Sequence, residues 1–163
     1  MPRPFDPSIL KPGDAILYFQ RDLIDWLIAL KTWTKVAHVE IYRDGQTSYA
    51  SRNGIGVNAY PLRLDGIAAV VRPRQPLDFA SADVWFENDA RGQPYDWLGL
   101  LCFMLARRRG EKHSMFCSEF ATRFYHAAKF APYNPRWPAV RVPPSFFLAS
   151  PAFETVWTDG DLF

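Results

Sequence analysis

The sequence predicts an α+β fold, and two observations carry this prediction. Residues 1–72 contain several short apolar or alternating segments separated by hairpin-type turns, a pattern typical of an antiparallel sheet. After Pro73 and Pro76 the hydrophobic period changes from that of a strand to that of a helix. Because strands come first and helices follow, we expect an antiparallel sheet of four to six strands packed against helices.

The individual elements follow from the same patterns. The first strand is expected directly after the Pro12-Gly13-Asp14 turn, and a glycine-rich corner at residues 53–56 separates two later strands. The expected strands cover residues 15–19, 37–42, 47–51, 57–62 and 68–72, and the expected helices cover residues 22–31, 81–90, 96–108 and 117–130.

The last part of the chain, from about residue 132, combines six prolines with several aromatic residues. Aromatic side chains gain from burial, so we expect a strap packed against the body of the protein rather than a disordered tail. At 163 residues, we expect one domain that includes this strap, covering residues 1–163. The sequence does not indicate an oligomeric state.

Charge and apolar runs limit the classes of partner. The formal net charge is +2, and no stripe of basic and aromatic residues supports nucleic-acid binding, so Arg107-Arg108-Arg109 is interpreted as a solvated helix end. The apolar run Trp97–Ala106 is about half of the roughly 20 residues that a transmembrane helix needs, so we expect a buried helix. No signal peptide opens the sequence, which predicts a cytoplasmic protein or one delivered by a phage or secretion route.

An Asp44-Gly45 pair between two alternating segments predicts a tight β-hairpin with a two-residue loop. In the expected register, His38 lies opposite Ser51 and Glu40 lies opposite Tyr49, on the polar face of the hairpin. A shift of one residue would reverse the faces, so this assignment depends on the turn. The hairpin therefore offers one histidine whose neighbours can be predicted.

Cys117 is the candidate nucleophile for this histidine. It falls in the first turn of the helix expected from residue 117, where the helix dipole and the unpaired N–H groups favour the reactive thiolate. Cys102 lies within an apolar run, where burial disfavours the thiolate. We expect two free thiols, of which Cys117 is the activated one.

The other two histidines, His113 and His126, are interpreted as surface residues. Together with Cys117 and His38 they lack the short ligand-pair spacing of ordinary zinc sites. We therefore expect neither a metal nor a cofactor.

Four segments carry a family resemblance that covers most of the chain. The segments 12–19 and 38–42 resemble the Gly-Asp strand and the histidine strand of the NlpC-type papain-like hydrolases. Residues 92–96 and 117–120 resemble the glycine-tyrosine segment and the Cys-Ser helix start of that superfamily. The cysteine block follows the histidine block here, an order that resembles the circularly permuted branch, which includes bacterial and phage proteins and the lecithin:retinol acyltransferase group.

The resemblance implies a papain-like α+β fold in which Cys117 is the nucleophile and His38 the base. It also implies that Tyr95 lies near the cysteine, where its hydroxyl could bind substrate or the oxyanion. The third polar group of the superfamily falls at Tyr49 or Ala50, and neither is a usual residue type there. Tyr49 is kept as a candidate substrate-binding residue, and Ser51 and Glu40 are equal candidates for the support of His38.

These residues predict a cysteine hydrolase or acyltransferase that acts on an amide or ester bond of a cell-wall peptide or an acyl lipid. A weakened or inactive relative that serves as a binding or structural module is the alternative, because the third position is unusual. A further alternative, a membrane-associated lipid binder, requires the apolar run Trp97–Ala106 to be exposed.

Overall fold

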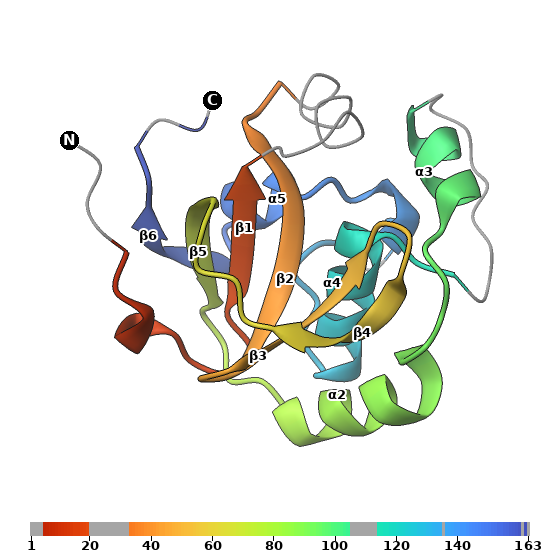
Figure 1. The fold of residues 1–163 in the computed structure, drawn as a ribbon, viewed down its shortest axis with the longest axis horizontal. Coiled ribbons are helices and arrows are strands. Elements are labelled where there is room, and N and C mark those ends of the chain that lie inside the picture. The colour runs from red at the N-terminus through yellow and green to blue at the C-terminus, as the bar shows by residue number, and fades with distance from the viewer. Residues whose placement is uncertain (1–4, 20–32, 105–113, 135, 161, 163) are drawn as a thin grey trace.

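The computed structural model describes residues 5–19, 33–104, 114–134, 136–160 and 162 (Figure 1). The helix expected at residues 22–31, His113 and the Arg107-Arg108-Arg109 run lie outside the described residues. The described part is an α+β structure built around an antiparallel sheet, which confirms the predicted fold class.

Six strands form the sheet in the order β4-β3-β2-β1-β5-β6, and every neighbouring pair is antiparallel. The first five strands agree with the strands expected from the sequence. The strands are β1 (Ala15–Phe19), β2 (Val36–Asp44), β3 (Thr47–Arg52), β4 (Gly56–Pro61), β5 (Ile67–Pro73) and β6 (Phe153–Thr158).

Strand β6 was not predicted, because the sequence analysis assigned its residues to the strap. It pairs with β5 along Pro73–Phe153 to Ala69–Thr158 and forms one edge of the sheet. The strap does pack against the body, since the Phe153 ring lies 5.4 Å from the Phe130 ring and 5.3 Å from the Tyr125 ring. The strap is therefore part of both the core and the sheet.

The helices follow the strands as expected. Helix α2 (Phe79–Trp85) continues into a π-helical turn at Phe86–Ala90, and α4 (Cys117–Ala127) packs against β2 and β3. Figure 1 shows α4 behind the β3–β4 hairpin and α3 (Trp97–Met104) at the periphery of the molecule. A short helix, α5 (Ser145–Ala149), and a 3-10 turn at Ala139–Arg141 belong to the strap.

The two faces of the sheet carry separate apolar clusters. Leu17, Val39 and Ile41 face the helix side, where they meet Phe120 and Phe124 of α4 in the main core. A smaller cluster on the other face contains Ile16, Tyr18, Tyr42 and Val70. Successive side chains of β1 and β2 point to opposite faces of the sheet, so both strands contribute to both clusters.

The register of the β2–β3 hairpin differs from the prediction by one residue. The structure pairs Ile41 with Tyr49 and Tyr42 with Ser48, and an irregularity between Tyr42 and Asp44 makes Arg43 an extra residue. The predicted pairing of His38 with Ser51 and of Glu40 with Tyr49 is therefore wrong.

The physical reason lies in the turn. The Asp44 carboxylate accepts a hydrogen bond from the Gln46 N–H at 3.1 Å, so Asp44 precedes the turn instead of forming its first residue. The turn then comes one residue later than expected, and the bulge at Arg43 adjusts the strand. As a consequence, alternate side chains of β3 face the opposite sides from those predicted.

Helix α3 differs from the expected buried helix. Trp97, Leu98 and Leu101 are 49%, 41% and 54% exposed, whereas Leu100 is buried. Cys102 belongs to this helix by its backbone, and its side chain lies outside the description. Among the described residues, no helix is long and apolar enough to span a bilayer.

Candidate functional site

Cys117 is the first residue of α4 and is almost fully buried. The preceding residue, Phe116, is the N-cap in an extended conformation, and its N–H donates to the Glu119 carboxylate three residues later. Phe120 and Phe124 then form the apolar stripe that docks α4 on the sheet. The sequence thus fixes where the helix begins, and the thiol lies in its first turn.

The segment before Cys117 is held by backbone and side-chain hydrogen bonds from distant strands. The Ser51 hydroxyl of β3 donates to the Met115 carbonyl, and the Met115 N–H donates to the Pro94 carbonyl at 3.2 Å. The neighbouring Gln93 carbonyl accepts from the Val57 N–H of β4 at 2.8 Å. These bonds tie the start of α4 to the β3–β4 hairpin.

Ser51 therefore does not have the role that was predicted for it. Its hydroxyl is buried and directed to Met115, on the helix side of β3, because the hairpin register is shifted by one residue. The support of His38 comes from the other candidate, Glu40. The His38 Nε2 lies 3.1 Å from the Glu40 Oε1, two residues along the same strand.

A carboxylate oxygen accepts hydrogen bonds, so Nε2 of His38 carries the proton in this pair. The Cys117 thiol is also a hydrogen-bond neighbour of the His38 ring. Since Nε2 is occupied by Glu40, the remaining nitrogen, Nδ1, is the one available to the thiol. The His38 side chain is 13% exposed, whereas Cys117 is almost fully buried.

Glu40 is completely buried and accepts hydrogen bonds on both carboxylate oxygens. Arg52 donates to both of them, through Nε to Oε1 at 2.9 Å and through Nη2 to Oε2 at 3.1 Å. The Ser48 hydroxyl donates to Oε2 at 2.5 Å. Burial alone would raise the pKa of Glu40, but hydrogen bonds and charge from His38 and Arg52 outweigh it and lower this pKa to about 2.

The same balance acts on His38. Burial would lower the pKa of its imidazole, but electrostatic interactions and hydrogen bonds with Cys117 and Glu40 raise it to about 10. The three side chains thus form a chain of hydrogen bonds from sulfur through imidazole to carboxylate.

Tyr49 does not line this site, which corrects the prediction that it binds substrate. Its ring is fully buried and stacks on Phe86 with 3.9 Å between the centroids, and its hydroxyl donates to Asp83 of α2. The shifted register turns Tyr49 toward the helices. Its residue type suits the core, where its phenol hydroxyl has a partner.

Tyr95 directly follows Pro94, and the Pro94 carbonyl accepts a hydrogen bond from the Met115 N–H. Tyr95 is therefore adjacent in the chain to a residue that contacts the segment leading into Cys117. Its ring packs edge-on against Trp97, with the centroids 5.1 Å apart. His126, in contrast, is exposed in the last turn of α4, as was expected of a surface histidine.

Sequence reasoning missed Arg52 and Ser48. Both lie on β3 at positions that the predicted register turned away from Glu40. Ser48 and Arg52 lie on the same face of the strand, but the sequence shows that this face is the one of Glu40 only when the bulge at Arg43 is known.

Comparison with protein-family models and with curated proteins finds no match to this chain.

Proposed function

We propose that this protein is a cysteine-dependent hydrolase or acyltransferase that acts on an amide or ester bond. The observation that supports the proposal is the hydrogen-bonded series Cys117–His38–Glu40, which two distant segments of the chain bring together. A nucleophile, a base in contact with it and a group that orients the base are the parts that thiol catalysis needs.

In the proposed reaction, the Cys117 sulfur attacks the substrate carbonyl carbon and forms a tetrahedral intermediate. The bond to the leaving amine or alcohol then breaks, and the His38 imidazolium gives the leaving group its proton. Water or another acceptor, deprotonated by His38, attacks the thioester and releases the acyl product and the thiolate. Glu40 remains ionised throughout and keeps the Nε2 proton in place.

A permuted papain-like topology, related to the NlpC-type hydrolases, is part of the proposal. The antiparallel sheet, the histidine on β2 and a later helix that begins at the cysteine agree with the order of motifs in that branch. Glu40 departs from the usual arrangement, since it supports the histidine from the same strand and not from the next one.

Cysteine labelling tests the nucleophile. Iodoacetamide should label the wild-type protein near neutral pH, and the Cys117→Ala variant should lose this labelling while Cys102→Ala keeps it. Cys117→Ala should also lose the turnover of p-nitrophenyl esters, and Cys102→Ala should keep it. A Cys117 that titrates near the value of a free thiol, about 8.5, would instead favour the inactive binding module.

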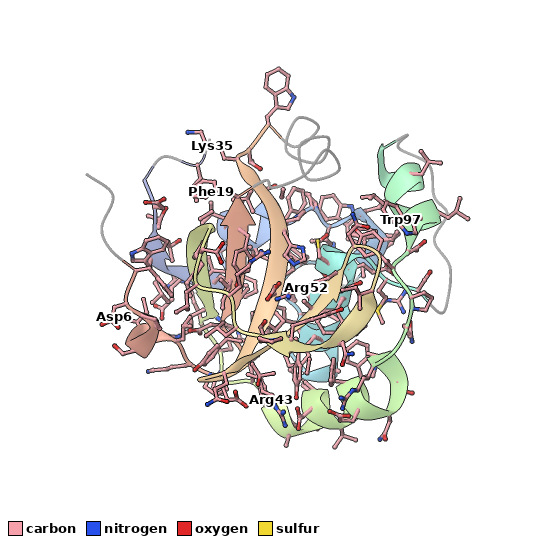
Figure 2. The ribbon with its side chains drawn as sticks, viewed as in Figure 1. Asp6, Phe19, Lys35, Arg43, Arg52 and Trp97 are labelled. Carbon is pink, nitrogen blue, oxygen red and sulfur yellow. The ribbon has the colours of Figure 1, made fainter. Side chains whose placement is uncertain are left out.

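For the substrate class, the exposed apolar face of α3 favours an acyl lipid over a cell-wall peptide. Trp97, Leu98 and Leu101 lie on one side of this helix, and Figure 2 shows Trp97 at the periphery of the molecule. Tyr95 connects this helix to the segment beside Cys117. Large solvent-exposed apolar patches commonly mark sites of contact with lipids or protein partners.

The same observation supports lipid binding at a membrane surface as a second candidate function. The test is flotation with vesicles of phosphatidylcholine and phosphatidylglycerol. Wild-type protein should float with the vesicles, and the double variant Leu98→Ser, Leu101→Ser should not. Val84→Ser is the control, because Val84 is also an exposed apolar residue but lies on α2. Wild-type protein that stays with the soluble fraction would contradict membrane binding.

A further inference from the structure

We propose that Arg52 is a positioning residue, which holds the Glu40 carboxylate in the orientation and charge state that His38 requires. The inference rests on the proposed function of Cys117 and His38 and extends it to a fourth side chain. Arg52 touches neither the sulfur nor the imidazole in the described contacts, so it acts through Glu40 alone.

The Arg52–Glu40 ion pair is bidentate. Two nitrogens of the Arg52 guanidinium bind the two oxygens of Glu40, at 2.9 and 3.1 Å. A bidentate contact of this kind fixes the plane of the carboxylate as well as its position. Because Glu40 Oε1 also meets His38 Nε2, fixing the plane of the carboxylate fixes the direction of the bond to the imidazole.

Arg52 is itself held in place by β4. Its guanidinium lies over the ring of Tyr60 at 4.2 Å, and the Tyr60 hydroxyl donates to the Gly56 carbonyl at 2.6 Å. The side chain is 25% exposed, and Figure 2 shows it over the middle of the sheet. Stacking on the ring and the bidentate contact together fix the orientation of the guanidinium, and the ammonium group of a lysine cannot make both contacts.

Without Arg52, the buried Glu40 carboxylate would be left with the Ser48 hydroxyl and the His38 ring, so its pKa would rise, and a protonated Glu40 would no longer stabilise a cationic His38. Several groups act on Glu40 besides Arg52: His38 from β2, Ser48 from β3, and the phenols of Tyr18 from β1 and Tyr60 from β4. Arg63 stacks on Tyr18 with 4.0 Å between its guanidinium and the ring centroid. Among the described residues, the His38 ring and the Arg52 guanidinium are the cationic groups in direct contact with the carboxylate, and only Arg52 contacts both of its oxygens.

The experiment is the pH dependence of the rate at which iodoacetamide alkylates Cys117, in a Cys102→Ala background. In the wild-type protein, the rate should stay high well below the pH at which a free thiol titrates. In Arg52→Met the midpoint should move up by about one pH unit or more, which is about a tenfold slower reaction on the acid side of the profile. Arg52→Lys, which keeps the charge and loses the fork, should fall between the two.

Arg72→Met is the matched control. Arg72 of β5 binds the buried carboxylate of Asp14 through two nitrogens, at 2.8 and 2.7 Å, outside the Cys117 site. Its loss removes an equivalent ion pair and should leave the alkylation profile unchanged. Circular dichroism checks that each variant is folded, and if Arg52→Met is unfolded the decision rests on Arg52→Lys.

The outcomes separate the two proposals. A wild-type Cys117 that titrates as a free thiol overturns the proposed function and with it the role of Arg52. An activated wild-type thiol whose profile is the same in folded Arg52→Met or Arg52→Lys overturns the role of Arg52 and leaves the proposed function intact. A shift of equal size in Arg72→Met also overturns it, since the effect would then come from general loss of stability.

Discussion

The change Glu40→Gln should remove one acid-dependent part of the protein's stability. Glu40 is completely buried and its pKa is about 2, against an ordinary value of 4.5. The folded-state pKa is the lower one, so the ionised carboxylate stabilises the fold above pH 4.5 and this contribution is lost as the pH falls toward 2. At about 1.4 kcal/mol for each unit, the loss is roughly 3 kcal/mol.

The measurement is urea unfolding followed by tryptophan fluorescence, at several pH values from about pH 6 down to about pH 2. The quantity of interest is the difference in free energy of unfolding between wild type and Glu40→Gln at each pH. This difference should shrink by roughly 3 kcal/mol over the range, because glutamine does not titrate. The constant cost of leaving Arg52 without its counter-ion drops out of the comparison.

Glu87→Gln is the matched control, since Glu87 forms an exposed ion pair with Arg91 at 2.8 Å. Exposed pairs contribute about 0–1 kcal/mol, so this difference should change little with pH. The reasoning is refuted if the Glu40→Gln difference is as flat as the control. In that case the pKa of Glu40 is the same in the folded and the unfolded protein, and His38 and Arg52 do not stabilise its ionised form.

Three further changes test other parts of the structure. Burial raises the pKa of Glu119 to about 7, so stability should fall as the pH rises from about 4.5 to 7, and Glu119→Gln should flatten this slope in urea unfolding. Tyr49→Phe should cost about 1–3 kcal/mol of unfolding free energy for the lost hydrogen bond to α2, without changing the alkylation of the thiol. Gly56→Ala should lower the melting temperature more than Gly54→Ala does, because both residues have a positive φ but a Cβ at Gly56 would lie 2.2 Å from the Gln93 carbonyl oxygen.

Local patterns predicted most of the fold. The strands that contain residues 15–19 and 57–61, and the helix that begins at Cys117, follow from alternation, turn residues and the phenylalanine stripe. Strand β6 could not be predicted in the same way, because its place at the sheet edge depends on the path of the whole strap. The exposure of α3 is also a tertiary property, since an apolar run has the same composition whether it is covered or not.

The site was predictable up to the point where one residue of register matters. Cys117 and His38 were predicted from residue type and local context, and the Cys117 thiol is a hydrogen-bond neighbour of the His38 ring. The choice between Ser51 and Glu40 depended on which face of β3 each side chain occupies. A bulge set by the Asp44 turn decides that choice, and a turn type is harder to read from sequence than a strand.

The bulge at Arg43 has two consequences for the site that arise together. It turns Arg52 toward Glu40, where it holds the carboxylate behind His38, and it turns Ser51 to the opposite side, where it binds the Met115 carbonyl. Two side chains that are adjacent in β3 thus hold the two halves of the site, one on the histidine strand and one at the start of the cysteine helix. A hairpin without the extra residue would exchange their faces and disconnect both, so the length of this turn shapes the candidate site as much as the residues proposed to carry the chemistry.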